Sequence, residues 1–208
     1  MPRRRVKICG ITRADDARLA AELGADAIGL NFHPQSPRAI HSLQIADIVG
    51  KLPAFVTVVG LFVDPLREDV EAVLNTGLIQ CLQFHGNETV DFCSSFGVPF
   101  IKAVRVKGLA EARSYLKPFQ GKCSVILDAY VKGAVGGTGE SFDWSVAGEI
   151  VRDGQNPIIL AGGLRPENVA EAIKAVRPYG VDVSSGVEMA PGVKDPEKVK
   201  RFIAAAAD

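Results

Sequence analysis

Short apolar runs alternate with longer helical stretches along the chain, and this alternation limits the possible folds more than any other feature. The apolar runs begin near Val6, Ala27, Val56, Ile79, Phe100, Val125, Ile158 and Val181. Their spacing of about 20 to 30 residues suits one strand–helix unit each. Eight such units predict an α/β fold, a (β/α)8 (TIM) barrel. Because no linker or low-complexity segment interrupts the chain, we expect one domain over residues 1–208.

A doubly wound open sheet is the alternative that the same alternation allows. Nucleotide-binding sheets of that kind carry a Gly-x-Gly-x-x-Gly turn after the first strand or a P-loop lysine. Gly10 does not begin such a turn, and the chain has no Walker motif. The closed barrel is therefore favoured.

Residues typical of helix caps and helix ends predict several helix boundaries. Thr12 begins a Thr-x-x-Asp capping pattern, Asp64-Pro65 reads as an N-cap followed by the first helical residue, and Asn87 reads as a third N-cap. These helices are predicted to end at Gly24, Gly77 and Gly97.

Composition excludes several classes of function. The 24 basic residues balance the 24 acidic ones, so no global field favours nucleic acid or an anionic membrane. The only basic run is Arg3–Arg5, which suits a solvated strand entry. No apolar segment approaches the roughly 20 residues of a membrane span, and the amino terminus lacks a signal-peptide core. The four cysteines form no CxxC pair, which argues against zinc and disulfides and favours a reducing cytoplasm.

Two of the later apolar runs end in small residues. One runs into Gly162-Gly163 and the next into Ser185-Gly186. Backbone N–H groups exposed near helix starts form a cradle for phosphate. In a (β/α)8 barrel such a cradle usually follows strands 7 and 8. The sequence therefore predicts a phosphorylated small-molecule substrate.

Side-chain alternation sorts the strand residues into two sets. One parity of each strand faces the barrel interior and the other faces the helices. The polar residues with inward parity are Lys7, Cys9, Gln83, His85, Asp128 and Asp182. They come from strands 1, 4, 6 and 8 and lie near the carboxyl ends, where barrel enzymes carry their chemistry. Since strands 1 and 8 adjoin in a closed barrel, Lys7 and Asp182 are expected to form an interior ion pair.

Each candidate also has a structural interpretation. Cys9 can be a small core residue, and His85 can be a core histidine with its hydrogen bonds satisfied. Asp128 can cap the loop that follows it. Arg38, in the loop after the second strand, can be merely solvated. The remaining cysteines, Cys81, Cys93 and Cys123, are assigned to packing.

The motifs together resemble one family. In chain order they are Lys7-Ile8-Cys9-Gly10-Ile11-Thr12, Ser36-Pro37-Arg38, Gln83-Phe84-His85-Gly86, Leu127-Asp128, Gly136-Gly137-Thr138-Gly139, Ala161-Gly162-Gly163-Leu164 and Asp182-Val183-Ser184-Ser185-Gly186-Val187-Glu188. This series closely resembles phosphoribosylanthranilate isomerase from the first strand to the last, with no departure at the motif positions.

The resemblance implies an activity and a set of roles. It implies an Amadori rearrangement in tryptophan biosynthesis, from N-(5-phosphoribosyl)anthranilate to 1-(2-carboxyphenylamino)-1-deoxyribulose 5-phosphate. By similarity, Asp128 is the general acid that opens the sugar ring, and Cys9 is the general base that removes the C2′ proton. Arg38 would hold the anthranilate carboxylate. The other predicted substrate-binding residues are Gln83, His85 and Asp182.

The same resemblance shapes the remaining expectations. The loop Gly136–Gly139 looks like a mobile lid, and Gly137 would complete the phosphate site formed by Gly162, Gly163, Ser185 and Gly186. A base near neutrality requires a lowered pKa for Cys9, with Lys7 as one possible cause. Acid–base isomerisation needs no metal and no cofactor. The protein is expected to be a monomer or a homodimer.

Two alternatives remain at the level of sequence. The nearer is another phosphosugar barrel enzyme, such as a pentose-phosphate epimerase or the Amadori isomerase of histidine synthesis. Against it, His33, His41 and His85 are poorly spaced for a metal, and the first strand ends in cysteine where the histidine enzyme uses aspartate. The more distant alternative is a non-catalytic barrel that binds a phosphorylated ligand.

Overall fold

Eight parallel strands pair in chain order and close on themselves, with β1 hydrogen-bonded to β8. The computed structural model describes residues 3–106, 108–129 and 144–207. The barrel strands are β1 (Arg5–Cys9), β2 (Ala27–Asn31), β3 (Thr57–Phe62), β4 (Cys81–Phe84), β5 (Phe100–Val106), β6 (Ser124–Ala129), β7 (Ile158–Ala161) and β8 (Gly180–Val183). Each begins within two residues of its predicted start, and the predicted fold class is confirmed.

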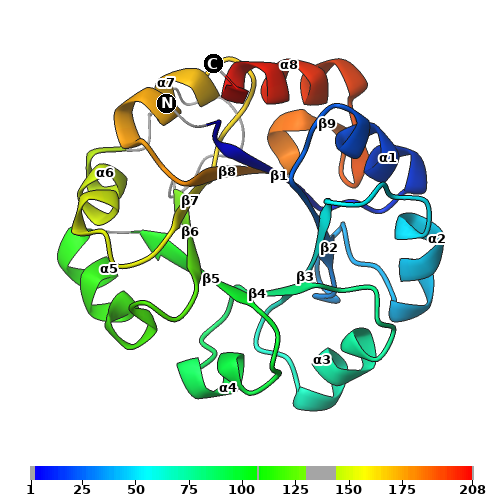
Figure 1. Ribbon diagram of the computed structural model, residues 1–208, viewed down its shortest axis with the longest axis horizontal. Helices are drawn as coiled ribbons and strands as arrows, with labels where there is room; N and C mark the ends of the chain where they lie inside the picture. The colour runs from blue at the N-terminus through cyan, green and yellow to red at the C-terminus, as the bar shows by residue number, and fades with distance from the viewer. Residues whose placement is uncertain (1–2, 107, 130–143, 208) are drawn as a thin grey trace.

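Helices form an outer ring around the strands (Figure 1). They are α1 (Ala14–Glu22), α2 (Ile45–Val49), α3 (Arg67–Leu74), α4 (Val90–Ser94), α5 (Leu109–Leu116), α6 (Trp144–Asp153), α7 (Val169–Val176) and α8 (Pro196–Ala207). Short 3-10 turns lie at η1 (Ser42–Gln44), η2 (Lys117–Phe119) and η3 (Ser185–Val187). Each barrel strand is thus followed by a helix, as the alternation in the sequence predicts.

The side-chain parity of the strands is also as predicted. Outward residues such as Val6, Ile8 and Leu127 pack in the large core between strands and helices. A smaller apolar cluster fills the barrel interior with Val59, Cys81, Ile101, Ala103, Ile126, Ile159 and Ala161. Because these apolar residues plug the barrel, the polar inward residues are left at its mouth.

A hairpin that the sequence analysis did not predict interrupts the connection from β8 to α8. Its strands are β9 (Glu188–Ala190) and β10 (Val193–Lys194), paired antiparallel. The Lys194 N–H donates to Asp16 of α1 at 3.0 Å, and the Thr12 hydroxyl donates to the Gly192 carbonyl at 2.6 Å. These bonds fasten the hairpin beside α1 (Figure 1).

The anchoring of the hairpin explains why the predicted cap at Thr12 is wrong. Helix α1 begins at Ala14 after Arg13, and the Thr12 hydroxyl is engaged with Gly192. The hydroxyl donates to a distant carbonyl instead of accepting from a backbone N–H of the first helical turn.

The predicted caps at Asp64 and Asn87 are wrong for a related reason. Helix α3 follows Leu66, and α4 is capped by Thr89, whose Oγ1 accepts from a backbone N–H at 3.3 Å. Asp64 and Asn87 instead meet each other, with the Asn87 N–H donating to Asp64 Oδ1 at 2.6 Å. The predicted ends are better placed, since Gly24, Gly77 and Gly97 follow their helices with φ of 97°, 71° and 70°.

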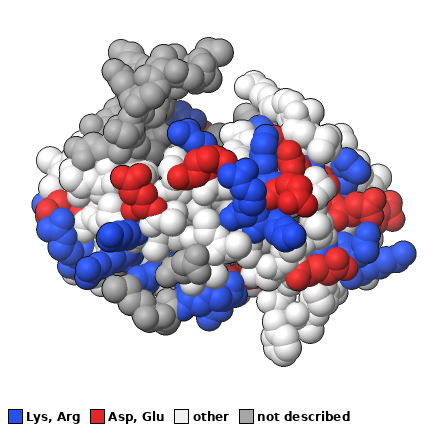
Figure 2. Space-filling view, turned by 90° about the horizontal axis from the view of Figure 1, so that it is seen from above, with Lys and Arg blue, Asp and Glu red and all other residues white. Residues whose placement is uncertain are grey.

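Basic and acidic side chains are interspersed on the face seen in Figure 2, with no large area of one sign. This distribution agrees with the equal numbers of basic and acidic residues. Among the described residues, no helix has both the length and the apolar character needed to span a bilayer.

Candidate active site

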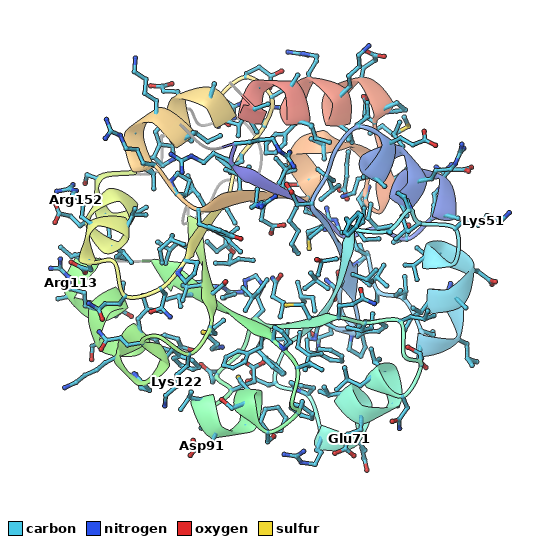
Figure 3. All side chains as sticks on the ribbon, viewed as in Figure 1. Lys51, Glu71, Asp91, Arg113, Lys122 and Arg152 are labelled. Carbon is cyan, nitrogen blue, oxygen red and sulfur yellow. The ribbon has the colours of Figure 1, made fainter. Side chains whose placement is uncertain are left out.

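A cavity of about 660 Å³ opens at the carboxyl ends of the barrel strands. The predicted site residues that line it are Cys9, Arg38, Gln83, His85, Asp128, Gly162, Gly163, Asp182, Ser185 and Gly186. Gly137 and the predicted lid lie outside the described residues. Figure 3 shows side chains pointing into the ring of strands, whereas the labelled Lys51, Glu71 and Arg152 lie at the periphery.

Cys9 is the last residue of β1 and is buried. Its register partner on β2 is Gly29. A Cβ atom at Gly29 would lie 2.8 Å from Cys9 Sγ and 3.0 Å from Lys7 Nζ. The absence of a side chain on Gly29 therefore makes room for the thiol and the ammonium group side by side.

The electrostatics of Cys9 differ from the sequence-based expectation. Burial raises the pKa of the Cys9 thiol, and Asp182 adds to the effect. Lys7 and Lys194 act in the opposite sense but do not outweigh burial. The expectation of a lowered pKa is therefore wrong for this barrel, because desolvation of the thiolate exceeds the attraction of the nearby cations.

Lys7 and Asp182 form the predicted interior ion pair. They are register partners on β1 and β8, and Lys7 Nζ lies 2.9 Å from Asp182 Oδ1. Burial disfavours the charged form of Lys7, yet Asp182 and Cys9 outweigh it and raise the pKa of Lys7. The mouth thus holds a lysine that stays protonated close to the thiol.

His85 and Asp128 meet across the mouth from Cys9. His85 Nε2 lies 3.5 Å from Asp128 Oδ2, and both side chains are partly exposed to the cavity. Arg105, which sequence analysis missed, is the register partner of Asp128 and also lines the cavity. Its inward parity with Ile101 and Ala103 on β5 could have identified it.

A buried ion pair supports the loop that carries His85. Lys102 Nζ donates to Glu88 Oε2 at 2.7 Å and to the Gly86 carbonyl at 2.6 Å. Glu88 Oε1 in turn accepts from the N–H groups of Gly86 and Asp64 at 3.1 and 2.9 Å. Since every charged atom is hydrogen-bonded, this pair fixes the loops after β3 and β4 against each other.

Arg38 reaches the cavity from the loop after β2, but it is not free. Its Nε and Nη2 donate to the Glu188 carboxylate at 2.8 and 2.6 Å. Glu188 raises the pKa of Arg38, and Arg38 with Lys194 overcomes burial to lower the pKa of Glu188. Sequence analysis missed Glu188 and Lys194 as partners, because the hairpin that brings them here was not predicted.

Gln83 is buried and points into the barrel. Within the described part of the chain its Oε1 atom has no hydrogen-bond partner. An unpaired buried oxygen is unfavourable, and this one lines the cavity. Gln83 thus brings an oxygen that can accept a hydrogen bond to the wall of the cavity.

The loops after β7 and β8 lie together at one side of the cavity. Gly162 and Gly163 have φ of 80° and 65°, a region that favours glycine. Gly186 packs so closely on the Leu164 carbonyl that a side chain would collide with it. Among the described residues, no turn or loop hydrogen bond uses the N–H groups of Gly163, Ser185 or Gly186.

The arrangement defines a chemical class. A closed (β/α)8 barrel presents a thiol, a carboxyl group and an imidazole around one cavity, next to two glycine-containing loops. Within the described residues no cluster of His, Cys, Asp and Glu side chains could hold a metal ion. The chain is therefore a barrel enzyme whose mouth is equipped for proton transfer.

Comparison with known proteins gives the family. The family model for N-(5'phosphoribosyl)anthranilate (PRA) isomerase matches residues 6–205. The isomerase of Pseudomonas savastanoi pv. phaseolicola is 51% identical over 97% of this chain and 96% of its own length. The enzyme of Azotobacter vinelandii is 52% identical over 96% and 95%. This chain belongs to the N-(5'-phosphoribosyl)anthranilate isomerase family.

Solved structures of the same family have the same fold as this chain. The phosphoribosyl anthranilate isomerase of Thermotoga maritima has a TM-score of 0.89 and 40% identity, with 98% of each chain covered. A complex of a phosphoribosyl anthranilate isomerase with reduced 1-(o-carboxyphenylamino)-1-deoxyribulose 5-phosphate has a TM-score of 0.86, 39% identity and the same coverage. The chain is an aldose–ketose isomerase of tryptophan biosynthesis that rearranges N-(5-phosphoribosyl)anthranilate, as the sequence predicts.

Proposed function

We propose that Asp128 and Cys9 are the general acid and the general base of this isomerisation. Asp128 donates its proton to the furanose ring oxygen, and the C1′–O bond breaks to give an open-chain Schiff base. Cys9 then removes the C2′ proton and leaves an enolamine. Addition of a proton at C1′ and loss of the proton on the C2′ hydroxyl give the ketone. Ring opening, enolisation and ketone formation all need only acid–base catalysis.

The observation that carries this proposal is the position of the two groups. Cys9 ends β1, Asp128 lies near the end of β6, and both line one cavity. A sugar lying across the mouth can therefore meet the acid with its ring oxygen and the base with C2′.

Lys7 supports the base in this proposal. The neutral thiol that burial favours must lose its proton before it can accept one from C2′. Lys7, held beside it by Asp182, supplies the positive charge that stabilises the thiolate. The Lys7–Asp182 pair thereby serves Cys9, and Asp182, which lines the cavity, binds a substrate hydroxyl.

The substrate lies with its phosphate at the loops after β7 and β8. Gly162, Gly163, Ser185 and Gly186 would present their N–H groups to the phosphate oxygens. Among the described residues, no turn or loop hydrogen bond uses the N–H groups of Gly163, Ser185 and Gly186. Arg38 binds the anthranilate carboxylate with the guanidinium edge that Glu188 leaves open. Gln83 and His85 line the cavity between these two ends.

A crystal structure with the product bound tests this orientation. Phosphate at the loops after β7 and β8, with C1′ and C2′ between Cys9 and Asp128, is the expected result. Phosphate at the loops after β1 to β3 would reverse the substrate and overturn the proposal.

We also propose a homodimer formed through the amino-terminal ends of the strands. Phe55, in the loop before β3, is fully exposed and has φ of 72°. It borders a second cavity, of about 360 Å³, at the end of the barrel opposite the active site, where Tyr179 is half exposed. An exposed aromatic ring next to an open cavity suits pairing by a two-fold axis. One similar isomerase, from Thermotoga maritima, is described as dimeric.

Light scattering during size-exclusion chromatography tests the assembly. The protein should show twice the mass of one chain, and Phe55→Ser should show the mass of one. Leu43→Ser, which changes another highly exposed apolar residue outside this surface, should not alter the mass. A monomeric starting protein would refute the dimer.

We place the reaction in the cytoplasm, because all four cysteines are free thiols. Cell fractionation with a cytoplasmic marker tests this location.

A further inference from the structure

The β9–β10 hairpin brings two buried and oppositely charged side chains behind the active site. Glu188 and Lys194 have side chains that are 5% and 0% exposed, and Lys194 Nζ lies 2.8 Å from Glu188 Oε1. Lys194 Nζ also donates to the carbonyls of Cys9 and Ser184, at 2.6 and 3.3 Å. One ammonium group thus joins the end of β1, the end of β8 and the hairpin.

Glu188 uses its carboxylate to hold Arg38 along one edge. The bonds to Nε and Nη2 form the parallel pair that a guanidinium makes with a carboxylate. Oε1 also accepts from the Gly192 N–H at 3.3 Å. Because Glu188 is fixed by Lys194 and Gly192, it cannot follow Arg38 if the arginine moves.

The stem of Arg38 has little freedom either. A Cβ atom at Gly10 would lie 2.5 Å from Arg38 Cδ, so the stem rests directly on the backbone after β1. Arg38 lines the active-site cavity, whereas Glu188 does not. The edge of the guanidinium that carries Nη1 is therefore the one not used by Glu188.

We propose that Glu188 is a positioning residue that sets the specificity of the isomerase for a carboxylated aromatic amine. It orients Arg38 so that the Nη1 edge meets the anthranilate carboxylate, and Lys194 holds Glu188 in place. The proposal rests on the role of Arg38 proposed above. Because Arg38 is already oriented, binding of the carboxylate does not incur the entropic cost of ordering its side chain. The enzyme therefore binds the anthranilate substrate more tightly than one whose amine lacks the carboxylate.

A purely structural role for the hairpin charges makes a different prediction. If Glu188 only stabilised the hairpin, its loss would disturb Cys9 and the phosphate loops for every substrate. If it acts through Arg38, its loss affects only substrates that carry the carboxylate.

The experiment compares two substrates in steady-state kinetics. One is N-(5-phosphoribosyl)anthranilate, and the other is N-(5-phosphoribosyl)aniline, which lacks the carboxylate. In Glu188→Gln we expect kcat/KM for the anthranilate to fall about tenfold, the effect of one weakened charged hydrogen bond, with kcat/KM for the aniline unchanged. Glu167→Gln is the matched control. It removes the charge of Glu167 from an exposed pair with Arg201, whose 2.8 Å length equals that of the Arg38 Nε–Glu188 bond, and should change kcat/KM for neither substrate.

A double-mutant cycle separates the two proposals. Arg38→Ala should remove the preference for the carboxylated substrate, and adding Glu188→Gln should then have no further effect. Equal losses on both substrates in Glu188→Gln, or a further loss in the Arg38→Ala background, would overturn the role of Glu188. Equal losses on both substrates in Arg38→Ala would instead overturn the role of Arg38.

A second variant covers the case in which Glu188→Gln does not fold. Glu188→Asp keeps the charge beside Lys194 but withdraws the carboxylate from Arg38 by one methylene. It should lose part of the preference for anthranilate while keeping the turnover of the aniline. An unchanged preference in Glu188→Asp would count against the proposal.

Discussion

Gly29 and Cys9 face each other across the β1–β2 pairing, and the thiol occupies the space that a side chain at Gly29 would need. A Cβ atom there would lie 2.8 Å from Cys9 Sγ and 3.2 Å from its Cα. The position of the proposed base, Cys9, therefore depends partly on the absence of a Cβ atom at Gly29.

Gly29→Ala should lower kcat by about 10²-fold, the effect of displacing a reacting group by roughly 1 Å. Turnover is followed through the loss of substrate fluorescence. Gly108→Ala is the control, because a Cβ at Gly108 meets no atom within 4 Å. Normal turnover in Gly29→Ala would mean that Sγ is not constrained as described.

Cys9→Ser should reduce turnover by at least about 10²-fold, the usual contribution of a positioned base. The change is nearly isosteric, so the thermal unfolding temperature should hardly move. Cys123→Ser alters a cysteine outside the cavity and should keep full turnover. If Cys9→Ser is as active as the parent, Cys9 has no part in the mechanism.

Asp128→Asn should abolish turnover, because an amide keeps the shape of the carboxyl group but cannot release a proton to the ring oxygen. Binding of the reduced product, measured by calorimetry, should be nearly unchanged. A loss of affinity in proportion to the loss of rate would show that Asp128 positions the substrate.

The raised pKa of Cys9 predicts how the thiol responds to pH. Alkylation by iodoacetamide requires the thiolate, so its rate at Cys9 should still be rising above the ordinary thiol pKa of about 8.5. Lys7→Met should shift the rise to still higher pH, because Lys7 lowers the pKa of Cys9 and its loss leaves Asp182 unpaired nearby. Mass spectrometry of the peptide that contains Cys9 measures both rates. A plateau already at pH 7 would contradict the burial of the thiol.

Gly163→Val should raise KM for the phosphorylated substrate about tenfold or more, because its side chain would occupy the space proposed for the phosphate. Gly154→Val is the control: both glycines have nearly the same φ, 65° and 66°, but Gly154 lies outside the cavity. Equal effects of the two substitutions on KM would point to backbone strain rather than to phosphate binding.

The barrel and its inward residues could be predicted because they depend on patterns of short period. Alternation along a strand fixes which side of the sheet each residue faces, and Lys7 and Asp182 meet because β1 and β8 close the barrel. Alternation also predicts the inward orientation of Cys9, Gln83 and Asp128, because each orientation depends only on the strand that carries the residue.

The parts that could not be predicted depend on contacts between distant loops. The Thr12 hydroxyl has a local capping pattern, yet its partner is Gly192, 180 residues later. The sequence places Arg38 at the substrate or in solvent, whereas two of its three guanidinium nitrogens donate to Glu188, 150 residues away. No periodic signal marks either partner, since both belong to the hairpin between β8 and α8.

The pairing of Lys7 with Asp182 has a consequence for the order in which the protein matures. During synthesis Lys7 emerges long before its carboxylate, and until β8 follows, β1 has an open edge and the lysine has no counter-ion. Closure of the barrel is therefore also the event that places a cation beside Cys9. A chain that stops before β8 would lack both a finished fold and the electrostatic environment of its base.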